Sequence, residues 1–187
     1  LITMNGDEVI EDGVIVVQGE RIVAIGPKGD VAIPDGAEQR DLAGKTVIPG
    51  LVDVHAHMGY GWADVSPEVV PAYAANLAYG VTTTHDPSAQ THFVFGQREL
   101  ELAGRLLGPR ITSTGFILYG ADIDDRATIE SLDDAREHLR RIKAYGGFSV
   151  KSYNQPRRDQ RQWVLQAAVE EDMLVVPEGG STLQHNL

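Results

Sequence analysis

From residue 46 onward, short apolar runs rich in β-branched residues alternate with longer runs that carry helix signals, and this alternation restricts the fold more than any other feature. In chain order the β-branched runs are TVIPGLVDVHAH, VTTTHDP, RITSTGFILYG, FSVKSYN and MLVVPEGG. Such runs predict strands, and the segments between them predict helices. Strands interleaved with helices favour a parallel sheet, because each parallel pair needs a long crossover connection.

Two of the expected helices have recognisable starts. The tripeptide SPE at 66–68 combines an N-cap serine with a first-turn proline and acid, so a helix is expected from there to Gly80, with Pro71 as a flaw inside it. Ser131 is followed three residues later by Asp134, which resembles a capping box. That pattern predicts a helix that closes on a Gly-Gly pair.

Residues 1–48 follow a different pattern of short strands and tight turns without a helical period. The runs GVIVVQG and RIVAIG meet at a Gly-Glu turn, which predicts a β-hairpin. We therefore expect two domains: a small all-β segment at 1–48 and an α/β domain at 49–187.

An open doubly wound sheet and a (β/α)8 barrel both satisfy the strand–helix alternation. A doubly wound nucleotide binder should carry a glycine-rich phosphate loop after its first strand, but the sequence there reads HAHMGYGWADVSPE. A complete barrel needs about 250 residues, and only about 140 follow residue 46. The expected fold class is α/β, a partial (β/α)8 TIM barrel of about strands 1–5 after the all-β segment.

Composition excludes several classes of partner and chemistry. The 27 acidic and 16 basic side chains give a net charge of −11, so neither nucleic acid nor an anionic membrane is an expected partner. The chain has no cysteine, which excludes disulfides, thiolate metal sites and a cysteine nucleophile. Because LITMNG resembles the end of a strand, we expect the chain to begin inside a longer protein, and its localisation stays undetermined.

His55 and His57 lie one residue apart at the carboxyl end of the first barrel strand. Residues two apart in a strand point to the same face, and the carboxyl ends of parallel strands are where ligands bind. Two neutral imidazoles in this arrangement suit Zn, Fe or Ni. The alternative is a chance pair of strand-end histidines, although burying each without partners costs about 1–3 kcal/mol.

The stretch GKTVIPGLVDVHAH resembles the first-strand signature of the amidohydrolase superfamily, the metal-dependent hydrolases built on a distorted (β/α)8 barrel. GVTTTHDP is similar to the second-strand pattern of the branch with imidazolonepropionase-like and Xaa-Pro dipeptidase-like enzymes. SVKSYNQPRRDQRQWV and MLVVPEGGS resemble amidohydrolase domains that follow TolB-like propeller repeats. The all-β start is similar to the small β-sandwich of many members.

The resemblance implies a ligand set for one or two divalent ions, which are expected to be zinc. His55 and His57 are expected to bind one ion, and Lys151, carboxylated by CO2, to bridge to a second. The alternatives for Lys151 are a solvent-facing lysine or a structural ion pair. Glu178 occupies the position where the family has a histidine, so it is a candidate metal ligand and catalytic carboxylate. The alternatives for Glu178 are a group that binds substrate or a structural carboxylate. His185 is the alternative metal ligand.

Three further residues are candidates for binding substrate. His85, with Asp86, ends the second strand and faces the same mouth if the barrel holds; a structural or capping role is the alternative. Tyr153 and Asn154 follow Lys151 and are placed to position a substrate carbonyl.

The expected function is a metal-dependent hydrolase that cleaves a C–N amide bond in a cyclic amide or a dipeptide by metal-activated water. Strands six to eight of the family pattern, with a histidine and an aspartate, do not occur in this sequence, so these residues alone are expected to be inactive. The competing hypothesis is a catalytically incomplete barrel domain that serves binding or assembly. The open sheet edge predicts cover by a homo-oligomer or by the remainder of the same protein.

Overall fold

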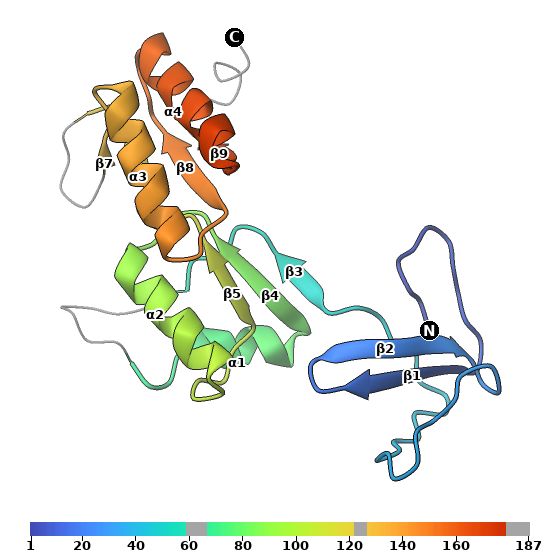
Figure 1. Cartoon of the computed structure of the whole chain (residues 1–187). Coiled ribbons are helices and arrows are strands. Elements are labelled where there is room, and N and C mark those ends of the chain that lie inside the picture. Colours follow the sequence, from blue (N-terminus) through green and yellow to red (C-terminus); the bar gives the residue numbers. More distant parts are fainter. Residues whose placement is uncertain (59–66, 122–126, 179–187) are drawn as a thin grey trace. The chain divides into compact units, whose positions relative to one another are not determined.

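The computed structural model describes residues 1–58, 67–121 and 127–178 (Figure 1). The chain divides into two compact units, Leu1–Gly50 and Leu51–Leu187. The fold is mixed α/β with parallel sheets. No helix among the described residues is both long and apolar enough to cross a membrane.

The first unit contains the predicted hairpin. Strands β1 (Gly13–Gln18) and β2 (Arg21–Pro27) pair antiparallel, with an irregularity between Val16 and Val17. Gly19 opens the turn with φ of 60°, a conformation that glycine adopts without steric cost. A backbone hydrogen bond of 3.0 Å from Ile2 N to Val47 O joins the two ends of this unit.

The second unit is built on two parallel sheets. The first has the order β3-β4-β5, with the bounds Leu51–Asp53, Val81–Asp86 and Arg110–Ser113. The second has the order β7-β6-β8-β9, and these strands are β6 (Leu118–Tyr119), β7 (Ala127–Thr128), β8 (Ser149–Tyr153) and β9 (Leu174–Glu178). Every pair within these two sheets is parallel, as the sequence predicted.

The strand predicted over residues 110–120 is interrupted and takes part in both sheets. Its first half, β5, pairs with β4, and its second half, β6, pairs with β8. Gly115 lies at the interruption with φ of 63°, and a Cβ there would stand 2.7 Å from the Thr91 hydroxyl oxygen. The close approach of Thr91 and the positive φ both require glycine at position 115. The strand changes its pairing partner from β4 to β8 across this interruption.

In the described part of the chain, four helices lie between the strands, as expected: α1 (Pro71–Ala78), α2 (Thr91–Leu102), α3 (Leu132–Ala144) and α4 (Arg158–Glu171). The expected start of the first helix was wrong, because α1 begins at Pro71; Ser66 lies outside the described residues. Proline lacks an N–H that the first turn does not need, so it begins the helix and does not interrupt it. The cap of α3 is confirmed, since Ser131 Oγ accepts a 3.1 Å hydrogen bond from Asp134 N.

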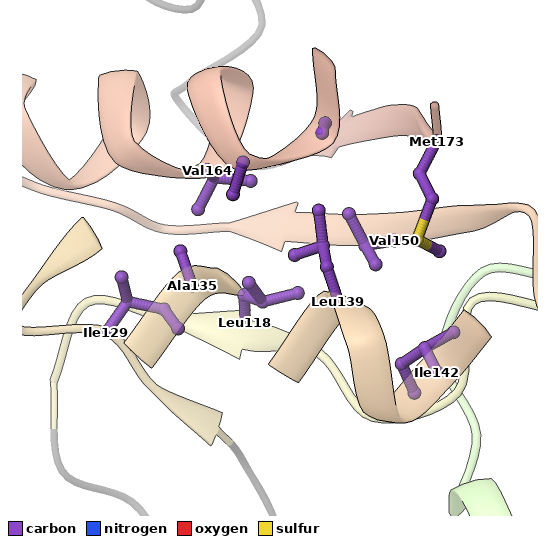
Figure 2. Close-up of a cluster of buried hydrophobic side chains, with 10 residues drawn as sticks. Leu118, Ile129, Ala135, Leu139, Ile142, Val150, Val164 and Met173 are labelled. Atoms are coloured by element: carbon purple, nitrogen blue, oxygen red, sulfur yellow. The ribbon is translucent and has the colours of Figure 1, made fainter. Parts of the chain in front are cut away.

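Helices α3 and α4 pack beside β6 and β8 over a buried apolar cluster (Figure 2). Its members are Leu118, Ile129, Ala135, Leu139, Ile142, Val150, Val164, Ala167, Ala168 and Met173. At the surface of this helix pair, Arg136 makes a two-point ion pair with Glu170, with bonds of 2.6 and 2.9 Å. The cluster holds β8 in place, and β8 carries Lys151.

A second apolar cluster joins α1, α2 and β5. It consists of Val70, Tyr73, Phe93, Val94, Phe95, Leu106 and Ile111. Each large apolar side chain buried in this way stabilises the fold by about 1.5–3 kcal/mol. This cluster supports the sheet that carries His85 and Asp86.

We expect Leu139→Ala to lower the free energy of unfolding by about 2–5 kcal/mol, because it leaves a cavity in the cluster of Figure 2. Urea unfolding followed by far-ultraviolet circular dichroism measures the change. Leu107→Ala is the matched control, since Leu107 is 73% exposed, and it should change stability by less than about 0.5 kcal/mol. Equal effects of the two substitutions would contradict the placement of this core.

His138 makes the stability of the chain depend on pH. Burial on α3, together with the positive charge of Arg141, lowers the pKa of His138 to about 4, although a hydrogen bond to Phe116 O at 3.3 Å acts in the opposite direction. Between pH 6.5 and about pH 4, His138 binds a proton in the unfolded chain but stays neutral in the folded chain. Stability from this group is therefore complete above pH 6.5 and falls as the pH drops through this window.

We expect His138→Gln to remove a loss of about 3 kcal/mol between pH 6.5 and 4, because glutamine does not titrate. Urea unfolding at half-unit steps of pH measures the slope for both proteins. Between pH 7.5 and 8.5 the two slopes should run parallel, which serves as the internal control. A wild-type slope that persists unchanged in the variant would refute this origin.

Candidate functional site

The polar side chains predicted from the sequence gather at the carboxyl ends of β3, β4, β8 and β9. His55 and His57 lie just beyond β3, and a 3.0 Å hydrogen bond from Ala56 N to His85 O ties this segment to β4. The two imidazole rings stand edge to face with centroids 5.0 Å apart. The spacing therefore brings both rings to one side of the segment although β3 itself ends at Asp53.

Glu178 links the first histidine to the lysine of β8. Its Oε2 lies 3.8 Å from His55 Nε2, and the same oxygen accepts a hydrogen bond from Lys151 Nζ. The Lys151 side chain is 1% exposed, whereas that of Glu178 is 41% exposed. Burial lowers the pKa of Lys151, and the negative charge of Asp86 acts in the opposite direction. Lys151 is thus the buried member of a pair that opens to solvent at Glu178.

His57 is bound to a buried carboxylate. Its Nδ1 lies 2.8 Å from Asp86 Oδ1, and the Asp86 side chain is 2% exposed. An ionised carboxylate can only accept, so a neutral His57 imidazole would donate from Nδ1 and keep the lone pair on Nε2. The imidazole therefore presents Nε2 as the atom that can bind a metal.

His85 belongs to a chain of hydroxyl groups. Thr112 Oγ1 donates to Thr84 O at 2.9 Å, so it accepts from His85 Nδ1, which lies 2.8 Å away. His85 Nε2 then accepts from Ser149 Oγ at 3.2 Å. Burial lowers the pKa of His85, as do the charges of Lys151 and His55, against the opposing charge of Asp86. Both ring nitrogens have protein partners, and the substrate role of His85 stays a prediction.

Tyr153 and Asn154 lie at the end of β8, and their substrate roles also stay predictions. Tyr153 is the register partner of Glu178 and stacks on Tyr119, with ring centroids 5.8 Å apart. Asn154 is exposed with φ of 43°. The alternative ligand His185 lies outside the described residues.

The donor groups occur as pairs. Within residues 1–58, 67–121 and 127–178, no group of three or more His, Cys, Asp or Glu is arranged to hold a metal ion. The contacts are His55 with Glu178 and His57 with Asp86, and Lys151 adds to the first. Sequence reasoning placed Asp86 at this mouth but missed its bond to His57. The signal available in the sequence was the His85-Asp86 pair at the end of β4, which places a carboxylate beside the strand that precedes His57.

Comparison with known proteins supports the resemblance to amidohydrolases. A scan against models of protein families gives no match. The imidazolonepropionase of Pseudomonas syringae pv. tomato is 30% identical over 132 residues, which is 65% of this chain and 32% of that protein. A solved amidohydrolase superposes with a TM-score of 0.73 at 19% identity, covering 94% of this chain and 54% of that one. The sequence of this chain is similar to that of an amidohydrolase-superfamily enzyme, and its fold is that of a solved amidohydrolase.

A solved Xaa-Pro dipeptidase with methionine bound in its active site has a TM-score of 0.65 at 22% identity, covering 88% of this chain and 51% of that one. The curated relatives and the solved structures together confirm the resemblance to the amidohydrolase superfamily, while the link to propeller-bearing proteins stays a prediction. The chain spans about a third or less of the curated relatives it matches and about half of these solved amidohydrolase-fold structures.

We expect Glu178→Gln to destabilise the fold by about 1–3 kcal/mol, because the buried Lys151 ammonium loses its anionic partner. This loss of stability is no larger than the about 3–5 kcal/mol typical of breaking a fully buried ion pair, because Glu178 is partly solvated. The double variant Lys151→Met, Glu178→Gln should recover at least half of that loss. Denaturant unfolding of the four proteins of this cycle measures the coupling, and strict additivity would show that the pair does not contribute.

Proposed function

We propose that the chain supplies the first metal ligands of a hydrolase that cleaves a C–N bond in a cyclic amide or a dipeptide. The observation that carries the proposal is the convergence of His55, His57, Lys151 and Glu178 at the carboxyl ends of parallel strands. In this proposal β3, β4, β5 with β6, β8 and β9 are the first five strands of a (β/α)8 barrel. The segment at 1–48 is then the β-sandwich portion that precedes the barrel.

The donor atoms fit a zinc ion chemically. His55 Nε2 and Glu178 Oε2 are 3.8 Å apart, and two ligands of a tetrahedral zinc stand about 3.3 Å apart. Imidazole nitrogen and carboxylate oxygen are both common zinc ligands. A displacement of a few tenths of an ångström would bring this pair to ligand spacing. His57 offers a lone pair beside them, since its proton is on the side of Asp86.

Lys151 is proposed to carry a carboxyl group in the loaded protein. The Lys151 ammonium would first lose one proton to solvent, and the neutral amine would then form a bond to the carbon of CO2 and lose a second proton. The two losses together would turn a cation into a carbamate anion. Because Lys151 contacts Glu178, the product would place two anions side by side. Such a pair is stable only with cations between them, so carboxylation and metal binding are expected to occur together.

The other residues of the site would bind and orient the substrate. When bound, an ion would supply an activated water with a pKa of about 7 and would polarise the scissile carbonyl. Tyr153 and Asn154 are proposed to hold the substrate next to this point. His85 would support the site as a neutral imidazole, fixed between Thr112 and Ser149. Support for a C–N substrate comes from the names of the similar proteins, an imidazolonepropionase and a Xaa-Pro dipeptidase.

The two outer strands indicate where further protein would pack. Strands β3 and β9 end the order of their sheets, and apolar residues on them are exposed: Leu51 at 52%, Val52 at 60% and Leu174 at 65%. Exposed parallel edges favour association. We propose that further strands of the same protein, or a second copy, cover them.

We expect the protein at its full natural length to bind stoichiometric zinc and to hydrolyse a cyclic amide or an Xaa-Pro dipeptide, with activity lost on treatment with a chelator. His55→Ala should weaken zinc binding at least tenfold, because it removes a ligand. Metal content by inductively coupled plasma mass spectrometry and amine release by chromatography are the two measurements. His92→Ala on α2, outside the ligand set, is the matched control.

Turnover that survives both the chelator and His55→Ala would overturn the metal-dependent mechanism. Zinc binding without turnover of any amide would favour the alternative of a barrel domain that serves binding or assembly.

A further inference from the structure

Asp86 is a buried anion whose position is fixed by the sheet. Its residue is 1% exposed, and a carboxylate removed from water is costly unless it is hydrogen-bonded. The backbone carbonyl of Asp86 accepts hydrogen bonds from Ser113 Oγ at 2.7 Å and from Thr114 N at 3.0 Å. These bonds tie the end of β4 to the end of β5. The carboxylate is therefore attached to a backbone that these two hydrogen bonds fix.

A single oxygen of this carboxylate joins two parts of the site. Asp86 Oδ1 accepts from Ser88 N at 2.8 Å and lies 2.8 Å from His57 Nδ1. The bond from Ser88 N orients the carboxyl plane, because it is made by backbone two residues along the same chain. The bond to His57 crosses from β4 to the segment that follows β3. The imidazole is thus oriented by a group that is itself fixed.

The chemistry of the bond sets the position of the proton on His57. An imidazole in the neutral form carries one proton, and the carboxylate can accept it only on Nδ1. His85, in contrast, is held through a threonine hydroxyl, whose donation to Thr84 O fixes its role. Of the two proposed ligands His55 and His57, His57 is the one that contacts the buried carboxylate of Asp86.

We propose that Asp86 is a positioning residue that keeps the His57 proton on Nδ1 and thereby makes Nε2 the metal-binding atom. The inference rests on the proposed function, since it assigns a role to Asp86 within the proposed metal site. Carboxylate groups that hold the second nitrogen of a ligand histidine fix its tautomer and orientation, and their loss typically weakens metal binding 10–100-fold.

The test uses the full-length protein and two readouts. In the metal-free protein at pH 8, 15N chemical shifts of the His57 ring should show the Nδ1–H tautomer. Asp86→Asn should shift the population toward the Nε2–H form. Titration of zinc followed by calorimetry should then show binding about 10–100-fold weaker in Asp86→Asn than in the wild type.

Asp53→Asn is the matched control. It removes a carboxylate from the same segment, but Asp53 Oδ1 accepts from the backbone N of His55 and not from an imidazole ring. The His57 tautomer should not change in this variant. A purely structural contribution of negative charge would move both variants alike and would overturn the proposal.

The outcomes separate the two claims. An Nε2–H tautomer of His57 in the wild type would overturn the role of Asp86, even if Asp86→Asn failed to fold. Zinc affinity that falls less than threefold in Asp86→Asn would also overturn it, while leaving the proposed metal site intact. Failure of the wild type to bind zinc would overturn the proposed function itself, and with it the assignment of Asp86 to a metal site.

Discussion

The parallel pairing of β4 with β3 on one edge and β5 on the other is the constraint on which the site depends. Parallel alignment brings the carboxyl ends of neighbouring strands to one side, so side chains far apart in sequence become neighbours. His57 meets Asp86 across 29 residues in this way. Without this alignment the histidines after β3 would have no buried carboxylate nearby.

Two buried charged groups, Asp86 and Lys151, impose the chemistry of this mouth. Each is 1% exposed, and each has a partner that opens to solvent, His57 for the carboxylate and Glu178 for the ammonium. Charges in such surroundings are retained only where they are paired and hydrogen-bonded. The apolar clusters beneath β5 and β8 keep the strands rigid enough to hold both pairs.

Much of the architecture could be predicted from local signals. The cap at Ser131, the hairpin at Gly19 and the alternation of strands and helices each depend on residues close in sequence, and the structure confirms them. The start of α1 and the interruption at Gly115 were not predicted. Proline is acceptable both inside a flawed helix and at its first position, and the contact with Thr91 that requires glycine at 115 crosses from another element.

The sequence by itself determined the α/β class and the residue types at the strand ends, because strand periodicity and the HxH motif are local patterns. The resemblance to the amidohydrolase superfamily likewise rests on short stretches of sequence. Only the tertiary structure decided which of these residues meet. It paired His57 with Asp86, joined Lys151 to Glu178 and enclosed His85 between two hydroxyl groups. These pairings depend on strand register and on which neighbour each strand selects, and both are properties of long-range packing that no local pattern specifies.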